Sequence, residues 1–229
     1  MKNFDYLEKN FSEVRADIAA LEEQYQRHIT LVCVTKSGSD EELLALFSLG
    51  AEAMGENRPQ ELKRRAELLY ANQLFPELHE IGTLQTNKVK MIAERVTLIH
   101  SLDKLSLAEE INKQAKKFGR KIPVLIEINS AEEEQKSGIL PKDAERFYES
   151  IADLDGITVK GLMTMGPVCE CPEEIRKYFR STKALFDKMN SQYGFGEEPV
   201  LSMGMSDSYT VAIEEGSTLV RVGRKLFIK

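Results

Sequence analysis

The spacing of hydrophobic positions divides the chain into a long helical segment and a series of short apolar runs. Between residues 4 and 27, apolar side chains recur at intervals of three and four, which predicts an amphipathic helix. These side chains are Leu7, Phe11, Val14, Ile18 and Leu21. The run 31–35 follows, apolar and β-branched, and a strand of this kind is typical of a parallel sheet buried on both faces.

After residue 31 the pattern alternates between strands and helices. The expected strands are 31–35, 51–54, 78–81, 96–100, 123–128, 157–165, 200–202 and 219–222. The expected helices are 40–49, one from Pro59, 87–93, 104–118, 141–154, 172–193 and 206–215. Eight such units predict an α/β protein, a single (β/α)8 TIM-type barrel with an additional N-terminal helix, in one domain over residues 1–229. An open doubly wound sheet is the rival, but no glycine-rich dinucleotide loop follows the first strand.

Composition narrows the classes of function. The chain has 229 residues, 42% hydrophobic and 30% charged, and a net charge of −6, which argues against a general nucleic-acid-binding role. Apolar runs such as 124–126 are too short to span a bilayer, and residues 1–5 lack a secretion signal, so we expect a cytoplasmic protein without membrane contact. Three cysteines give no disulfide framework, and Cys169-Glu170-Cys171 lacks zinc-site spacing, so no metal site is expected.

Lys36 directly follows the first strand. In a barrel this position lies at the carboxyl edge of the sheet, where α/β proteins bind ligands. A partly desolvated lysine amine can form an imine with a carbonyl compound. The alternative interpretation is a solvated lysine that merely flanks the strand.

Two C-terminal segments resemble an anion site. Residues 201–206 (LSMGMS) run into a helix, and backbone amides and hydroxyls at a helix start bind anions. Residues 220–224 (VRVGR) place Gly223 where a ligand can approach the backbone, beside a cationic Arg224. Phosphate sites formed by the last two β/α loops are common in barrels. An ordinary helix cap with two surface arginines is the alternative.

Several segments together resemble a known family. They are Val34-Thr35-Lys36, Gly55-Glu56-Asn57, Ile81-Gly82-x-Leu84-Gln85-x-Asn87-Lys88, Lys136-Ser137-Gly138, residues 161–166 (GLMTMG), residues 201–206 (LSMGMS) and residues 216–223 (GSTLVRVG). The chain is similar to the pyridoxal 5′-phosphate (PLP) homeostasis proteins, also called the YggS/PROSC family. The segments run in order through nearly the whole chain.

The resemblance implies a barrel like the N-terminal domain of alanine racemase, of the fold-type III class of PLP proteins. It implies that Lys36 carries PLP as an internal aldimine, that Asn57 lies beside the ring, and that Arg221 faces the pyridine nitrogen. It further implies a phosphate site and a second lysine near the cofactor mouth, Lys136. The phosphate site comprises Ser206, Gly223 and Arg224, with help from Ser202 and Met203.

Two positions depart from the family pattern. Thr83 stands where the family usually has a histidine, so the role of that histidine is not carried over. Arg224 stands where threonine is usual, and its guanidinium either joins the phosphate site or points into solvent.

The expected function is PLP binding for intracellular buffering or delivery, without strong catalysis. PLP and PLP-dependent apo-enzymes are then the expected partners, and the small size is compatible with a monomer. A catalytic fold-type III enzyme such as an amino-acid racemase is the alternative. Racemases take a second acid/base from an additional C-terminal domain, for which 229 residues are expected to leave no room. A third hypothesis is a barrel for another sugar- or nucleotide-phosphate.

Overall fold

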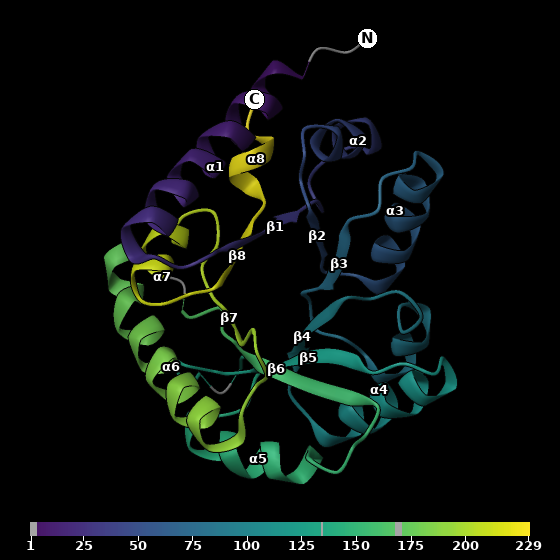
Figure 1. Ribbon diagram of the computed structural model, residues 1–229, viewed down its shortest axis with the longest axis vertical. Coiled ribbons are helices and arrows are strands. Elements are labelled where there is room, and N and C mark those ends of the chain that lie inside the picture. Colours follow the sequence, from purple (N-terminus) through teal and green to yellow (C-terminus); the bar gives the residue numbers. More distant parts are fainter. Residues whose placement is uncertain (1–3, 134, 168–170) are drawn as a thin grey trace.

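Eight parallel strands pair in sequence order and close into a barrel. The computed structural model describes residues 4–133, 135–167 and 171–229. Each strand pairs with its neighbour along the chain, and β1 pairs with β8 to complete the ring (Figure 1). The strands are β1 (Thr30–Val34), β2 (Ala53–Glu56), β3 (Glu77–Glu80), β4 (Leu98–Leu102), β5 (Ile122–Glu127), β6 (Ile157–Met163), β7 (Val200–Ser202) and β8 (Leu219–Val222). The predicted (β/α)8 barrel is therefore confirmed.

Helices surround the barrel between consecutive strands. They are α1 (Asp5–Tyr25), α2 (Asp40–Ser48), α3 (Pro59–Ala71), α4 (Leu105–Lys117), α5 (Ala144–Ile151), α6 (Pro172–Tyr193), α7 (Tyr209–Glu214) and α8 (Arg224–Phe227). Two 3-10 helices, η1 (Thr86–Met91) and η2 (Pro141–Asp143), complete the connections. The local signals are ordinary ones. Ser39 and Glu42 form a capping box at the start of α2, and Pro59 occupies the first turn of α3.

Strand alternation separates an inner layer from an outer one. The inner apolar cluster takes one buried residue from each of six strands: Val32, Ala53, Leu98, Leu125, Met163 and Leu219. The outward-facing neighbours of these residues pack under the helices in two further clusters, one of them much larger than the inner one. Because successive side chains in a strand point to opposite faces, every second residue lines the barrel interior. This alternation decides which residues reach the mouth of the barrel.

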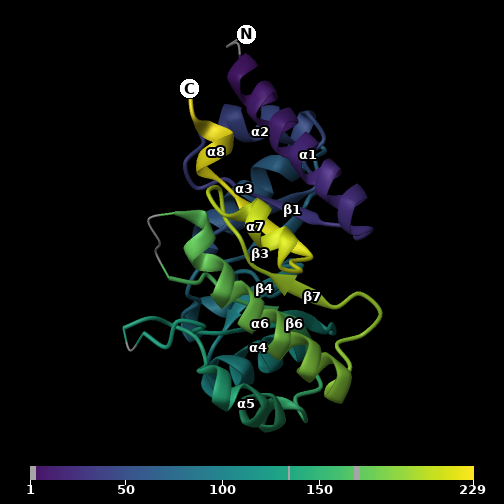
Figure 2. The ribbon, with the colours of Figure 1, turned by 90° about the vertical axis from the view of Figure 1, so that its left-hand side faces the viewer.

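The additional N-terminal helix, α1, covers the seam where the ring closes. It packs against α7 and α8, and the two views show it running along the outside of β1 and β8 (Figures 1 and 2). Its apolar stripe, which includes Phe11 and Ile18, joins a cluster with Cys33 of β1 and Val222 of β8. The predicted stripe and its extra helix are confirmed.

Several element boundaries differ from the expected ones. β4 begins at Leu98 rather than at residue 96, because the Val96 amide still bonds to the Ile92 carbonyl at the end of the preceding turn. The segment expected to be helical at 87–93 is the 3-10 helix η1, and the helix expected from residue 206 begins at Tyr209. The short helix α8 has no counterpart among the predicted elements, since four residues carry no helical period.

No helix in the described ranges is long and apolar enough to cross a membrane. Of the expected pair of loop cysteines, Cys171 is exposed, whereas Cys169 lies outside the described residues.

Candidate functional site

The carboxyl ends of the strands bring the predicted site residues to one mouth of the barrel. Thr35 continues the pairing of β1 by donating its amide to the Gly55 carbonyl, and its side chain turns outward to Glu56. Lys36, the next residue, lies in the turn that follows β1 at the rim of the barrel and is exposed. Arg221 and Gly223 share the inward register of β8, in which Leu219 already lines the interior. Because β8 pairs with β1, Arg221 lies on the strand next to the one that Lys36 follows.

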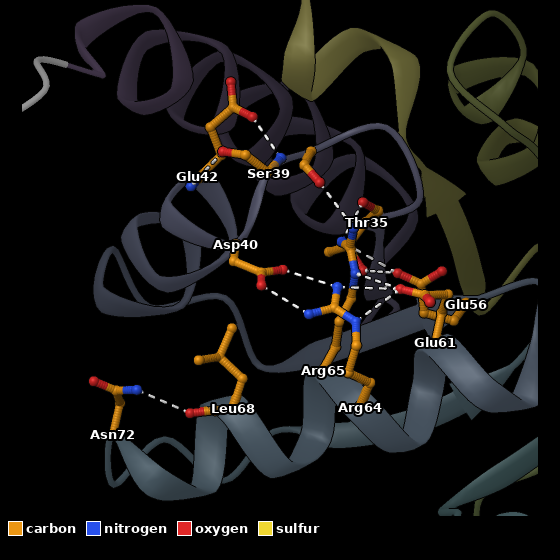
Figure 3. Close-up of polar contacts among 11 residues, drawn as sticks. Thr35, Ser39, Asp40, Glu42, Glu56, Glu61, Arg64, Arg65, Leu68 and Asn72 are labelled. Carbon is orange, nitrogen blue, oxygen red and sulfur yellow. Dashed lines mark hydrogen bonds and ion pairs between the residues drawn. The ribbon is translucent and has the colours of Figure 1, made fainter.

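The Lys36 side chain is exposed and lies on a loop whose backbone is held by a side chain of α3. Its side chain makes no hydrogen bond or ion pair within the described ranges. Arg65 of α3 donates to the carbonyl oxygen of Thr35 before it and to that of Gly38 after it, the latter at 2.8 Å (Figure 3). The partial desolvation expected for Lys36 is not observed. The backbone around the amine is fixed while the amine itself remains free.

Arg65 is itself part of a buried polar cluster. Its guanidinium lies 3.3 Å from the Glu56 carboxylate, and the Thr35 hydroxyl donates to the same carboxylate at 2.5 Å (Figure 3). Glu56 and Arg65 are almost entirely buried, at 2% and 6% exposure. Burial raises the pKa of Glu56, and the Thr35 hydroxyl and the Arg65 guanidinium oppose that rise. The motif Gly55-Glu56-Asn57 therefore supplies a carboxylate that ties β2 to the Lys36 loop.

Arg221 is a buried cation in the interior of the barrel, just below the mouth. It donates through Nη1 to the Ser202 hydroxyl and through Nη2 to the Thr164 carbonyl at 3.0 Å. Burial lowers its pKa to about 10, and the nearby Glu127 carboxylate opposes this shift. Since 10 is still well above neutral pH, Arg221 remains a charged hydrogen-bond donor.

Two backbone amides converge on one oxygen at the end of β8. The amides of Gly223 and Lys225 both donate to the Ser206 hydroxyl, at 3.2 and 3.3 Å. A Cβ at residue 223 would lie 3.0 Å from both the Cβ and the carbonyl oxygen of Val34, so the strand ends require glycine there. Converging amides of this kind suit an anionic oxygen. Ser206 and Gly223, predicted together from separate segments, do lie together.

Ser202 and Met203 have other contacts. The Ser202 hydroxyl bonds to Arg221 and, at 3.0 Å, to Nδ1 of His100, deep in the barrel. The Met203 side chain is fully buried in the outer core, and its amide donates to the Leu219 carbonyl. Their predicted help at the phosphate site is therefore carried by neither side chain in this arrangement.

Three other predicted residues lie around the rim. Asn57 is exposed, and its backbone contacts Gly82 so closely that a Cβ on Gly82 would lie 2.3 Å from the Asn57 carbonyl oxygen. Arg224 is exposed and pairs with Asp207 at the surface, which agrees with the alternative in which its guanidinium points into solvent. Lys136 pairs with Glu133 at 2.8 Å and reaches the Gly166 carbonyl at 3.4 Å. Thr83, one of the departures, is exposed.

Sequence reasoning missed several side chains that build this site. It assigned no role to His79 or His100, yet both line the barrel interior and bond to each other at 2.9 Å. Strand alternation could have indicated this position, because residues two apart in a strand point to the same face and every second residue of each strand therefore lies inside the barrel. Arg65 gave no comparable signal, since its spacing in α3 resembles that of any surface arginine. Glu127 is the last residue of β5, but nothing local marks it as a neighbour of Arg221.

The barrel and its mouth define a protein of the alanine racemase N-terminal domain family. The model of that family, alanine racemase, N-terminal domain, matches residues 10–228.

Relatives narrow this class. A pyridoxal phosphate homeostasis protein of Aquifex aeolicus (strain VF5) is 43% identical over 197 residues, 86% of this chain and 85% of the relative. One of Helicobacter pylori (strain ATCC 700392 / 26695) is 38% identical over 207 residues, 89% of this chain and 90% of the relative. The chain belongs to the pyridoxal phosphate homeostasis protein family.

A solved structure supports the same grouping. PipY, the COG0325 family member of Synechococcus elongatus PCC7942, superposes with a TM-score of 0.84 and is 25% identical. The alignment covers 97% of this chain and 100% of PipY, which was solved with PLP bound.

Proposed function

We propose that this protein binds PLP covalently through Lys36 and buffers or delivers it inside the cell, with no strong catalytic activity of its own. The observation that carries the proposal is the free Lys36 amine just after β1, next to the strand β8 that carries buried Arg221 and leads to the converging amides of Gly223 and Lys225. When bound, PLP supplies an aldehyde that condenses with amines and a phosphate that needs hydrogen-bond donors.

The residues at the mouth fit such a ligand. Lys36 would hold the cofactor through its amine, because a lysine amine can condense with an aldehyde with loss of water. The two amides that now bond to the Ser206 hydroxyl are the donors for a phosphate oxygen, and Ser206 itself can donate to it. Asn57 and Lys136 are proposed to lie beside the ring and near the entrance.

The charge of Arg221 favours a PLP carrier over an enzyme that forms carbanions on PLP. A guanidinium that stays charged can donate a hydrogen bond to the ring nitrogen but cannot accept its proton. The ring nitrogen then stays unprotonated, which weakens the ring as an electron sink for carbanion chemistry. The curated relatives compared with this chain carry the homeostasis name, and racemization is not proposed as the main function.

The covalent link is tested by absorbance and by mapping. PLP added to the dialysed protein is expected to give a visible band that borohydride bleaches, with the reduced adduct on Lys36. Lys36→Ala should give no band, and Lys63→Ala, which removes an exposed lysine of α3, should give the wild-type band. A colourless protein, or an adduct on another lysine, would contradict the proposal.

Delivery is tested separately. Loaded protein mixed with a PLP-dependent apo-enzyme should activate that enzyme, and the rate is compared with that given by the same concentration of free PLP. A slow, steady release that protects PLP from competing amines would support buffering, and faster activation than free PLP would support direct delivery. Exchange of α-deuterium into amino acids should stay at the level of Lys36→Ala, and Lys36-dependent turnover would favour the racemase instead.

A further inference from the structure

Five side chains from four strands form one hydrogen-bonded chain through the barrel interior. Arg221 bonds to Ser202, Ser202 to Nδ1 of His100 at 3.0 Å, and Nε2 of His100 to Nδ1 of His79 at 2.9 Å. Nε2 of His79 then reaches the Glu77 carboxylate at 3.2 Å. The chain therefore connects the residue beneath the mouth to the opposite end, or floor, of the barrel.

The order of donors along this chain follows from its two ends. A guanidinium only donates, so the Ser202 oxygen accepts from Arg221. The only other described partner of the Ser202 hydroxyl is Nδ1 of His100, which therefore accepts its proton. His100 then carries its own proton on Nε2 and donates to Nδ1 of His79, and His79 donates from Nε2 to Glu77. In every one of these hydrogen bonds the donor lies on the Arg221 side and the acceptor on the side of the Glu77 carboxylate.

The middle of this hydrogen-bonded chain is buried. His79, His100 and Ser202 are 2%, 0% and 0% exposed. Burial, with smaller effects from His79 and Arg221, lowers the pKa of His100 well below its ordinary value. Two buried imidazoles thus separate the buried guanidinium from the Glu77 carboxylate on the floor, and the Glu77 side chain is 57% exposed.

The end of this hydrogen-bonded chain at the floor of the barrel lines a cavity. A hollow of about 730 Å³ at the amino ends of the strands is lined by Glu77, His79, Leu98 and Leu219, and also by His28. Small molecules can reach His79 from this side without passing through the mouth. His28 lies in the same cavity but pairs with Glu22 and takes no part in the chain.

We propose that His100 and His79 are positioning residues that hold the Arg221 guanidinium against the cofactor ring through Ser202, with Glu77 fixing the direction of the chain. This inference rests on the proposed function. Without His100 the buried Ser202 proton has no acceptor, so the hydroxyl rotates and no longer holds Nη1 of Arg221. The geometry of Arg221, and with it the charge environment of the ring nitrogen, then changes although neither histidine contacts the ligand.

The first test uses the protein without PLP. Nitrogen NMR of ¹⁵N-labelled histidine should show His79 and His100 as neutral rings protonated on Nε2, unchanged between pH 6 and pH 8. A proton on Nδ1 of His100, or a charged ring in this range, would overturn the direction of the chain. This measurement is independent of whether the protein binds PLP.

The second test uses PLP-loaded variants with the wild-type fold, checked by circular dichroism. His100→Leu should shift the visible band of bound PLP and weaken retention about tenfold, the effect of losing one hydrogen bond to a charged group. His100→Gln, which can still accept from Ser202 and donate to His79, should restore most of the wild-type spectrum. Unchanged spectrum and retention in His100→Leu, while the wild type binds PLP, would overturn the positioning role alone.

The floor cavity supplies a rescue experiment. His79→Gly should show the altered spectrum of His100→Leu, and added imidazole should restore the wild-type spectrum by entering the cavity and replacing the lost ring. His28→Gly, the matched control in the same cavity, should be normal with and without imidazole. Failure of imidazole to restore a folded, PLP-binding His79→Gly would count against the proposal, and failure of the wild type to bind PLP would instead defeat the proposed function.

Discussion

At the scale of single residues, Arg65 fixes the loop that carries Lys36. It is the one side chain that bonds to the carbonyls on both sides of that loop, Thr35 and Gly38, within the described ranges. It also pairs with buried Glu56. Its neighbour Arg64 makes good bonds to Asp40 at 2.7 and 2.9 Å, but does so at the surface (Figure 3). Two adjacent arginines of one helix therefore offer a matched comparison.

Arg65→Met is expected to lower the free energy of unfolding by about 3 kcal/mol, because it leaves the Glu56 carboxylate buried without its cation. Arg64→Met should cost less than about 1 kcal/mol, as exposed ion pairs do. Urea denaturation followed by circular dichroism measures both. Arg65→Met should also incorporate PLP more slowly, since the Lys36 loop is no longer held. Equal costs for the two variants would show that the buried contacts of Arg65 do not stabilise the fold.

At the scale of elements, β2 and β3 each end in a glutamate, and these two residues lie side by side. Glu56 and Glu80 are in register, and both side chains point outward under the helices. Neither carboxyl oxygen of Glu80 has a hydrogen-bond partner among the described residues. Burial raises the pKa of Glu80 to about 8, and the nearby Glu56 carboxylate adds to this rise. The Gly82 amide opposes the rise, although it is not placed to form a full hydrogen bond with Glu80.

The stability of the protein should therefore fall as the pH rises from about 4.5 to 8. In this window folded Glu80 keeps a proton that the unfolded chain, with an ordinary pKa of 4.5, has already released. Glu127, whose pKa burial and Asp103 raise to about 7, adds a dependence of the same sign. Glu80→Gln should flatten the decline.

Urea midpoints at pH 5 and pH 8 measure this dependence. The control Glu94→Gln changes an exposed carboxyl of the chain and should leave the wild-type decline intact. A Glu80→Gln variant with the full wild-type decline would show that Glu80 is ionised in the folded protein at neutral pH.

At the scale of the whole molecule, the proposed ligand site joins the two ends of the barrel sequence. Lys36 follows β1 and Asn57 follows β2, whereas Ser206 and Gly223 follow β7 and β8. The ring closes between these strands, and α1 packs over the seam (Figures 1 and 2). A ligand held here contacts the first and last parts of the chain at once, so its binding is linked to the integrity of the whole barrel.

PLP should consequently raise the thermal unfolding midpoint as its concentration increases. At a hundred times the dissociation constant the gain is about 2.7 kcal/mol. For a chain of this size that corresponds to roughly 5–10 °C. Differential scanning fluorimetry measures the shift. Lys36→Ala should show a smaller shift at the same PLP concentration, and pyridoxal, which lacks the phosphate, should shift the wild type less than PLP does. An equal shift for Lys36→Ala would place the stabilising interaction elsewhere.

Much of the architecture and part of the site could be predicted from local pattern. The apolar runs located all eight strands, and the polar residues that follow them located Lys36, Ser206 and Gly223 at one mouth. The boundaries of β4 and η1 were missed because backbone bonds between consecutive elements, such as Val96 to Ile92, override the apolar pattern. Arg224 illustrates a different limit, since its nearest acid, Asp207, is brought to it only by the folding of the β7 loop.

The sequence by itself determined the order of strands and helices, the closure implied by eight units, and the place of Lys36 at the carboxyl edge of the first strand. These features depend on periods of two and about 3.6 residues, which are local properties of the chain. Only the tertiary structure decided that Arg65 holds the Lys36 loop and that Arg221 is linked through Ser202 and His100 to the floor of the barrel. Ser202 and His100 are 102 residues apart in the chain. Their contact depends on how the strands are staggered around the closed ring, and no local pattern encodes that stagger.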